Sequence, residues 1–232
     1  MNPLLRDSAA HVFVDDLAAP ALGDADLHHL SNVLRLRDGE LVSASDGAGG
    51  WRMCEWHGEA LRVAGDILTS VAPSPRVSVA FVPVKGDRSE WIVQKLTEIG
   101  VDDIVVLAPT RRSVVRWSNV DKQLDKLRIV AREAAMQSRR THLPAVAGLV
   151  PLADALARPG AVVADPLGAE LGGGPLASLV IVGPEGGFDD EELPAAVTRA
   201  TLGGTILRAE TATLVAATLL VARRHAHVAS TR

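Results

Sequence analysis

The chain has 232 residues, carries a formal net charge of −4 at pH 7 and is 47% hydrophobic. This length is enough for one large domain or two modest ones, and the composition is ordinary for a globular protein. The one cysteine, Cys54, excludes a disulfide framework within the chain and is typical of a reducing compartment. Residues 1–10 contain no apolar signal-peptide core, and the longest apolar run, residues 214–222, is too short to span a bilayer. We therefore expect a cytoplasmic protein that does not enter a membrane.

Residues 1–72 predict a small β-rich domain. Short strands are expected at residues 11–14, 36–45, 51–56 and 60–64, with a hairpin turn at Asp46-Gly47. Residues 24–34 place three leucines on one face of a short amphipathic helix with an aspartate cap. Such short strands suggest a small barrel. Two prolines and the lack of apolar periodicity mark residues 71–76 as a linker, so a second domain is expected at residues 73–232.

The second domain opens with a strand, a helix and a strand. A buried strand is expected at residues 77–83, and the helix after it ends at Gly100 before a strand at residues 103–108. The apolar face of this helix is formed by Ile92, Leu96 and Ile99. A βαβ unit of this kind predicts a parallel sheet with a right-handed crossover. Lys95 and Glu98 should share a helix face, where a simple ion pair is the expected role.

Basic residues are concentrated after the second of these strands. Residues 111–142 contain nine lysines and arginines against three acids, although the whole chain is acidic. Arg111, Arg112 and Arg116 follow the carboxyl end of a strand, where α/β sheets place ligand loops, and they could contact phosphate. A helix expected at residues 121–140 carries a basic stripe formed by Arg128, Arg132 and Arg139. A local basic surface suits a polyanion, and the alternative is a solvated helix face with i,i+4 ion pairs.

The most informative stretch is residues 179–193. A buried strand at residues 179–182 is followed by turn residues and then by four carboxylates that cap a helix. The turn residues are Gly183, Pro184, Gly186 and Gly187. Strand, glycine-rich turn and helix form the layout of a nucleotide-type site. Because Glu185 and the four carboxylates would repel phosphate, the loop favours a neutral or positively charged ligand such as an adenosine or a sulfonium. A capped turn without a ligand is the alternative.

Residues 202–212 show a second combination of turn glycines, a short apolar segment and a charged helix start. Turn glycines precede a short apolar strand expected at residues 205–207, and charged residues then open an Ala-rich helix at residues 210–225. A further strand, expected at residues 161–166, ends in a turn.

The motifs GPEGG…E and LG…ILR.ETA resemble the cofactor-binding knot of SPOUT-class methyltransferases. They are similar in particular to the RsmE family, which methylates N3 of a uridine in small-subunit (16S) ribosomal RNA with S-adenosylmethionine. The stretches HHLSNVLRLRDGE and KGDRSEWIVQKLTEIGVDDIVVL extend the resemblance over the whole chain. It implies an α/β fold, a SPOUT-type parallel sheet with a C-terminal deep trefoil knot, preceded by a small PUA-like β-barrel. The chain departs from the family at Met136, where a glutamate is usual, and Glu133 stands one turn earlier.

The resemblance also implies the site residues. The cofactor would be bound by Gly183, Glu185, Gly186, Gly187, Leu202, Leu207 and Arg208. Glu210 would take the proton of uridine N3 and Arg208 would balance charge on the uracil oxygens. RNA would be bound by Arg35, Arg111, Arg112, Arg132 and Arg139. The alternatives are that Glu210 only caps the last helix and that Arg208 pairs with Glu185.

The expected partners are small-subunit ribosomal RNA, free or in the assembled subunit, and a second copy of the chain packed through the last helix. No metal motif such as His-Glu-x-x-His or a pair of cysteines is present, so metal chemistry is not expected. With no tyrosine and three phenylalanines, an aromatic platform for base stacking is not expected either. Two other functions stay open. One is a SPOUT methyltransferase that acts on tRNA or on a ribose 2′-hydroxyl, and the other is an RNA-binding or assembly protein without catalysis.

Overall fold

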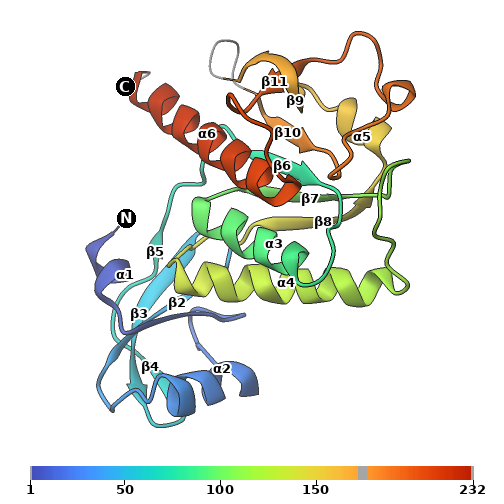
Figure 1. Cartoon of the computed structure of the whole chain (residues 1–232). Coiled ribbons are helices and arrows are strands. Elements are labelled where there is room, and N and C mark those ends of the chain that lie inside the picture. Colours follow the sequence, from blue (N-terminus) through green and yellow to red (C-terminus); the bar gives the residue numbers. More distant parts are fainter. Residues whose placement is uncertain (1, 172–176, 231–232) are drawn as a thin grey trace. The chain divides into compact units, whose positions relative to one another are not determined.

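The computed structural model describes residues 2–171 and 177–230 (Figure 1). These residues divide into two compact units. The first unit contains Met1–Ala72 together with Arg132–Leu143, and the second contains Pro73–Ala131 and Pro144–Arg232. A unit boundary therefore lies at residue 72. Residues 132–143, which the sequence pattern assigned to the second domain, pack with the first unit.

The first unit is built on a five-stranded sheet with the strand order β1-β2-β3-β4, in which β5 pairs with β3. Its elements are α1 (Pro3–Asp7), β1 (Ala10–Phe13), α2 (Asp24–His28), η1 (His29–Val33), β2 (Leu41–Ser45), β3 (Gly50–His57), β4 (Ala60–Val63) and β5 (Leu68–Thr69). β1 runs parallel to β2, and the other pairs are antiparallel. The helix expected at residues 24–34 is present as α2 followed by the π-helical turn η1.

Buried contacts hold residues 132–143 in the first unit. Met136 joins the apolar cluster of this unit. The buried His11 lies between two partners: its Nε2 donates to the carbonyl oxygen of Arg140 at 3.0 Å, and its Nδ1 accepts from Ser43 Oγ at 2.8 Å. These contacts join residues far apart in the chain, so no local pattern could have assigned the segment.

The second unit is a six-stranded sheet with the strand order β11-β9-β10-β6-β7-β8 (Figure 1). Its elements are β6 (Ser78–Phe81), α3 (Arg88–Ile99), β7 (Asp103–Leu107), α4 (Val120–Gln137), β8 (Ala145–Val150), α5 (Leu152–Leu156), β9 (Ala161–Glu170), β10 (Leu179–Val182), η2 (Asp190–Glu192), β11 (Arg199–Thr201) and α6 (Ala209–Ser230). The last part of α4, from Arg132, belongs to the first unit. Neighbouring strands run parallel, which confirms the predicted parallel sheet.

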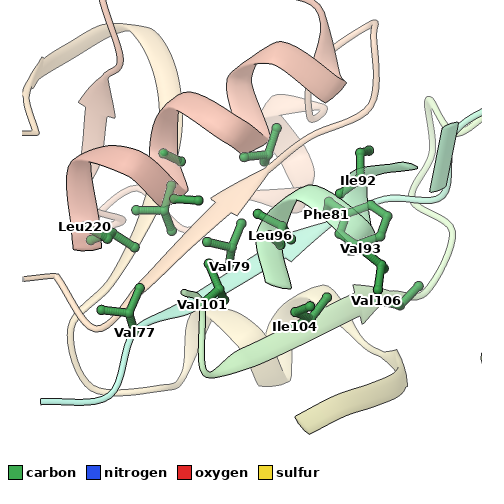
Figure 2. Packing of buried hydrophobic residues seen from close by; sticks show 14 of the residues in the cluster. Val77, Val79, Phe81, Ile92, Val93, Leu96, Val101, Ile104, Val106 and Leu220 are labelled. Carbon is green, nitrogen blue, oxygen red and sulfur yellow. The ribbon is translucent and has the colours of Figure 1, made fainter. Parts of the chain in front are cut away.

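The central strands are buried on both faces because successive side chains point to opposite sides of the sheet. Val79 and Phe81 of β6 belong to one apolar cluster, and Ala80 between them belongs to another. Figure 2 shows the first cluster, in which the strand residues lie with Leu96 of α3 and Leu220 of α6. This packing fixes the ends of β6, β7 and β10, and the loops that follow these strands form the site described below.

The helix α3 follows its sequence signals. It begins after Asp87 and ends at Gly100, whose φ of 105° lies in the left-handed region that favours glycine. Lys95 Nζ lies 2.8 Å from Glu98 Oε1, so the predicted ion pair is confirmed. The βαβ unit is present as β6, α3 and β7.

Two expectations near the C-terminus are wrong. Residues 205–207 form no strand, and Ile206 is 88% exposed. The strand that pairs with β9 is β11, which lies earlier in the chain. β9 continues past its expected end at residue 166, and its pairing with β11 jumps from Val163 to Ala169. The chain therefore bulges within a strand where a turn was expected.

Candidate cofactor and RNA site

The glycine-rich loop follows β10, which lies between β9 and β6 in the sheet. The N–H of Gly187 donates to the carbonyl oxygen of Pro184 at 2.8 Å and closes a turn, with the φ of Gly187 at 70°. At Gly183 an added Cβ would meet the ring of Phe188 at 3.1 Å. At Gly186 it would meet nothing closer than 3.5 Å. Gly187 is favoured by its positive φ and Gly183 by the close contact with Phe188, whereas the predicted approach of a cofactor to the backbone of Gly186 stays a prediction.

Arg111 and Arg112 contact the acidic segment after this loop. Arg112 donates to the carbonyl oxygen of Gly186 at 2.9 Å and to the Asp189 carboxylate at 3.4 Å. Arg111 pairs with Glu191. The backbone N–H of Glu191, and then the Arg112 and Arg111 charges, hold the pKa of Asp189 below its usual range. Both arginines are thus engaged by their own chain, and their predicted contact with RNA stays a prediction.

Three charged side chains from separate elements meet beside the loop. Arg88, at the start of α3, donates to Glu210 Oε1 at 3.1 Å and to Glu185 Oε1 at 3.4 Å. Glu210, in the first turn of α6, is only 14% exposed. Its Oε2 is buried and has no hydrogen-bond partner among the described residues. Because an unpaired buried acceptor costs free energy, this oxygen would be stabilised by a ligand that donates to it.

Glu210 carries a negative charge at neutral pH. A hydrogen bond from the backbone N–H at the start of α6, followed by the hydrogen bond from Arg88 and the charges of Arg88 and Arg208, lowers its pKa, while burial opposes the shift. The expected capping role agrees with this backbone contact. An ionised carboxylate can only accept, so the buried Oε2, which has no partner among the described residues, is suited to a ligand N–H.

The loop between β11 and α6 carries the remaining predicted cofactor residues. Leu202 is half-buried against the apolar cluster shown in Figure 2, and Leu207 is also half-buried. Arg208 is exposed, and within the described part of the chain its side chain makes no hydrogen bond or ion pair, although its charge acts on Glu210. The cation beside Glu185 is Arg88, so the alternative pairing of Glu185 with Arg208 is absent. Bare backbone, apolar side chains and carboxylates together fit a ligand that joins an adenosine to a positive charge.

The other predicted RNA-binding arginines belong to the first unit. Arg132 pairs with Asp26 at 2.6 Å and is half-buried. Arg139 lies beyond the end of α4 with a φ of 58°, and its guanidinium donates to the carbonyl oxygen of Ser8 at 2.8 Å. The expected stripe along one helix therefore does not form. Arg35 is exposed. The roles of these three arginines in RNA binding stay predictions.

Sequence reasoning missed Arg88. The motif around it indicates only the start of a helix, whereas its partners Glu185 and Glu210 lie 97 and 122 residues away. A long-range ion pair leaves no periodic signal in the sequence. Within residues 2–171 and 177–230, no group of three or more His, Cys, Asp or Glu side chains could hold a metal ion, and no helix is long and apolar enough to cross a membrane.

Two family descriptions match the chain. A family described as an RNA methyltransferase domain matches residues 72–221, and a family described as an RNA methyltransferase PUA domain matches residues 22–55. The first match contains the glycine-rich loop, Arg88 and Glu210. The second lies within the first unit and contains Arg35.

Comparison with individual proteins also finds RNA methyltransferases. The chain is 34% identical to the ribosomal RNA small subunit methyltransferase E of Mycobacterium bovis, over 87% of this chain and 86% of the relative. The crystal structure of a ribosomal RNA small subunit methyltransferase E from Neisseria gonorrhoeae, bound to S-adenosyl methionine, superposes with a TM-score of 0.78 and 25% identity over 92% of this chain and 97% of that chain. A putative methyltransferase from Legionella pneumophila, in complex with S-adenosylmethionine, shares the fold with a TM-score of 0.81 at 24% identity, over 92% and 97% of the two chains.

Proposed function

This chain belongs to the ribosomal RNA small subunit methyltransferase E (RsmE) family, and on that basis we propose that it methylates N3 of a specific uridine in small-subunit (16S) ribosomal RNA. The methyl donor is S-adenosylmethionine, the molecule named in the related Neisseria gonorrhoeae structure. The observation that carries the chemistry is Glu210, a carboxylate with one oxygen held by Arg88 and the other buried without a partner among the described residues.

The residues around the glycine-rich loop fit this cofactor. When bound, S-adenosylmethionine supplies a methyl group on a positively charged sulfur. The backbone of Gly186 allows close approach, and Leu202 and Leu207 offer apolar surface for an adenine. The carboxylates of Glu185 and Glu210 favour the positive charge over a phosphate. The trefoil knot expected at this site stays a prediction.

The chain's own charged groups prepare the uridine. N3 is a poor nucleophile while it carries its proton, so a protein group must take the proton or stabilise the anion of the base. Glu210 Oε2 accepts the N3–H, and Arg88 fixes the carboxylate in place. The lowered pKa of Glu210 makes it a weak proton acceptor. Because Glu210 alone is a weak acceptor, a positive charge is also needed to stabilise the anion of the base. Arg208, which is exposed and lies two residues before Glu210 in the sequence, stabilises this negative charge on the uracil oxygens.

The test is methyl transfer from labelled S-adenosylmethionine to small ribosomal subunits that lack N3-methyluridine, followed by nuclease mapping of the product. Label recovered as N3-methyluridine in the subunit RNA is the expected result. Label on tRNA or on a ribose 2′-hydroxyl would keep the enzyme class and overturn the substrate. Binding of cofactor without any transfer would favour an RNA-binding protein that lacks catalysis.

We further propose a cytoplasmic location and a homodimer. Both rest on the resemblance to the family. The apolar residues Ala216, Ala217 and Leu220 of α6 are no argument for a dimer, because they are already buried within their own unit. Light scattering of the purified protein at micromolar concentration measures the dimer directly.

A further inference from the structure

A pocket of about 480 Å³ lies in the second unit, outside the candidate site. It is lined by the loop after β6, by the first turn of α3, by the loop after β7 and by the start of α4. Because β6 and β7 are parallel neighbours, these loops follow adjacent strand ends. Its charged and aromatic lining residues are Lys85, Asp87, Glu90, Arg116, Trp117 and Lys126.

The pocket carries both signs of charge with a positive excess, from Lys85, Arg116 and Lys126 against Asp87 and Glu90. In the described part of the chain, the side chains of Lys85 and Arg116 have no hydrogen bond or ion pair. These two cations, which have no carboxylate partner among the described residues, are available to a phosphate.

Glu90 lines the pocket. It is 15% exposed, and its Oε1 accepts from Lys126 Nζ at 2.7 Å. Its Oε2 is buried and has no hydrogen-bond partner among the described residues. Lys126 is 59% exposed, so it can turn toward a phosphate and uncover the carboxylate. Glu90 is then an acceptor for a ligand N–H group.

Trp117 supplies an apolar surface in the same pocket. Its side chain is half-buried and packs against the core of the unit on one side, while it lines the pocket on another. An indole held in this way can stack against a base, and nearby cations can hold the phosphate of the same nucleotide.

The pocket shares two segments with the candidate site. Asp87 of the pocket precedes Arg88, which contacts Glu185 and Glu210. The loop that carries Arg116 and Trp117 also carries Arg112, which donates to Gly186. A strand of RNA whose uridine reaches Glu210 would therefore have a neighbouring nucleotide within reach of the pocket.

We propose that this pocket binds one unpaired nucleotide that flanks the methylated uridine, an inference that rests on the proposed function. The base stacks on Trp117 and donates an exocyclic amine to Glu90, which selects cytosine, adenine or guanine over uracil. The phosphate is held by Lys85, Arg116 and Lys126.

The test compares Trp117→Ala and Glu90→Ala with the wild type in binding to small ribosomal subunits, without cofactor, and in base-edge chemical probing of the bound RNA. Matched controls are Trp91→Ala and Glu98→Ala, because both side chains lie on α3 outside the pocket. We expect Trp117→Ala to weaken binding by about 10-fold, as loss of one stacked base does. We also expect one nucleotide beside the target uridine to lose its protection in both pocket variants.

The proposal is overturned if the wild type does not bind subunits, if the pocket variants bind and protect as the controls do, or if only the target uridine loses protection. Cofactor binding by calorimetry, unchanged in both variants, shows that they are folded. The binding and protection measurements test the pocket without any need for methyl transfer. A chain that binds subunits and shows the flanking protection but transfers no methyl group would contradict the proposed function and leave the pocket assignment standing.

Discussion

Two glutamates of the second unit, Glu210 and Glu90, share an unusual property and differ in what surrounds it. Each lies in the first turn of a helix, each is mostly buried, and each has a buried Oε2 without a hydrogen-bond partner among the described residues. Glu210 is held by Arg88, which is 34% exposed and also contacts Glu185. Glu90 is held by Lys126, which is 59% exposed.

This difference separates a fixed carboxylate from one that can be uncovered. A guanidinium that contacts two carboxylates has little freedom, so Glu210 keeps its charge and its orientation before a ligand arrives. A lysine on a flexible stem near solvent can leave Glu90 at small cost. Preorganised charge suits a reacting centre, whereas a displaceable pair suits the recognition of a bound nucleotide.

The change expected to have the largest effect is Glu210→Gln. It removes the acceptor for the N3 proton and keeps the shape of the side chain, so we expect kcat for methyl transfer to fall by roughly 10²- to 10⁴-fold. Single-turnover transfer of labelled methyl to small subunits measures it. Glu98→Gln, which alters an ion pair on α3, is the control and should keep its rate. A Glu210→Gln protein with the rate of the wild type would show that Glu210 only caps α6.

In the first unit, the buried His11 predicts a loss of stability in acid. Burial lowers the pKa of His11 to about 4. The folded pKa lies below the unfolded value, so the neutral form is the stable one. The contribution of neutral His11 to the free energy of unfolding is complete above pH 6.5 and is lost as the pH falls toward 4. We expect a loss of about 3 kcal/mol over this window.

Urea denaturation at pH 7, 5.5 and 4.5 measures this loss. His11→Gln provides the matched variant, because a glutamine cannot take up the proton. It should be less stable than the wild type at pH 7, and its free energy of unfolding should change less between pH 7 and pH 4.5. Equal slopes in the two proteins would show that another group controls the acid limit.

Local patterns in the sequence were enough for most of the fold. Short, largely apolar segments placed β6 and β7, and Gly100 marked the end of α3. The failures lie where pairing partners are distant. Residues 205–207 have the composition of a strand, but the strand beside β9 is β11. Residues 132–143 pack with the first unit through His11, which lies 129 residues from Arg140.

The candidate site was predicted unevenly for the same reason. The glycine-rich loop was predicted from its turn glycines, which are a local signal, whereas the role of Glu210 was implied only by the resemblance to the family. Arg88 was missed because its role depends on two carboxylates from other elements. Arg111 and Arg112 were correctly placed after β7, but the sequence could not show that the acidic segment after β10 engages them.

Arg88→Ala tests the fixed side of the comparison with a smaller effect. Without the guanidinium, the hydrogen bond and charge that lower the pKa of Glu210 are lost, so this pKa should rise. The acid limb of the pH–rate profile should move to higher pH, and the rate at neutral pH should fall by roughly tenfold. Arg88→Lys, which keeps the charge, should restore part of the shift. A fall in rate with an unmoved acid limb would mean that Arg88 acts on substrate or cofactor binding instead.

Lys126→Ala tests the displaceable side and should have the smallest effect. Because Lys126 is mostly exposed, water replaces much of the stabilisation that its ammonium provides to the Glu90 carboxylate. The free energy of unfolding should therefore fall by less than about 1 kcal/mol. Urea denaturation at neutral pH measures this, with Lys95→Ala as the matched control for a half-exposed pair on α3. A loss of about 3 kcal/mol or more is the value expected when a buried pair is broken. Such a loss would show that Glu90 is as firmly held as Glu210, and that Lys126 cannot leave it for an incoming phosphate.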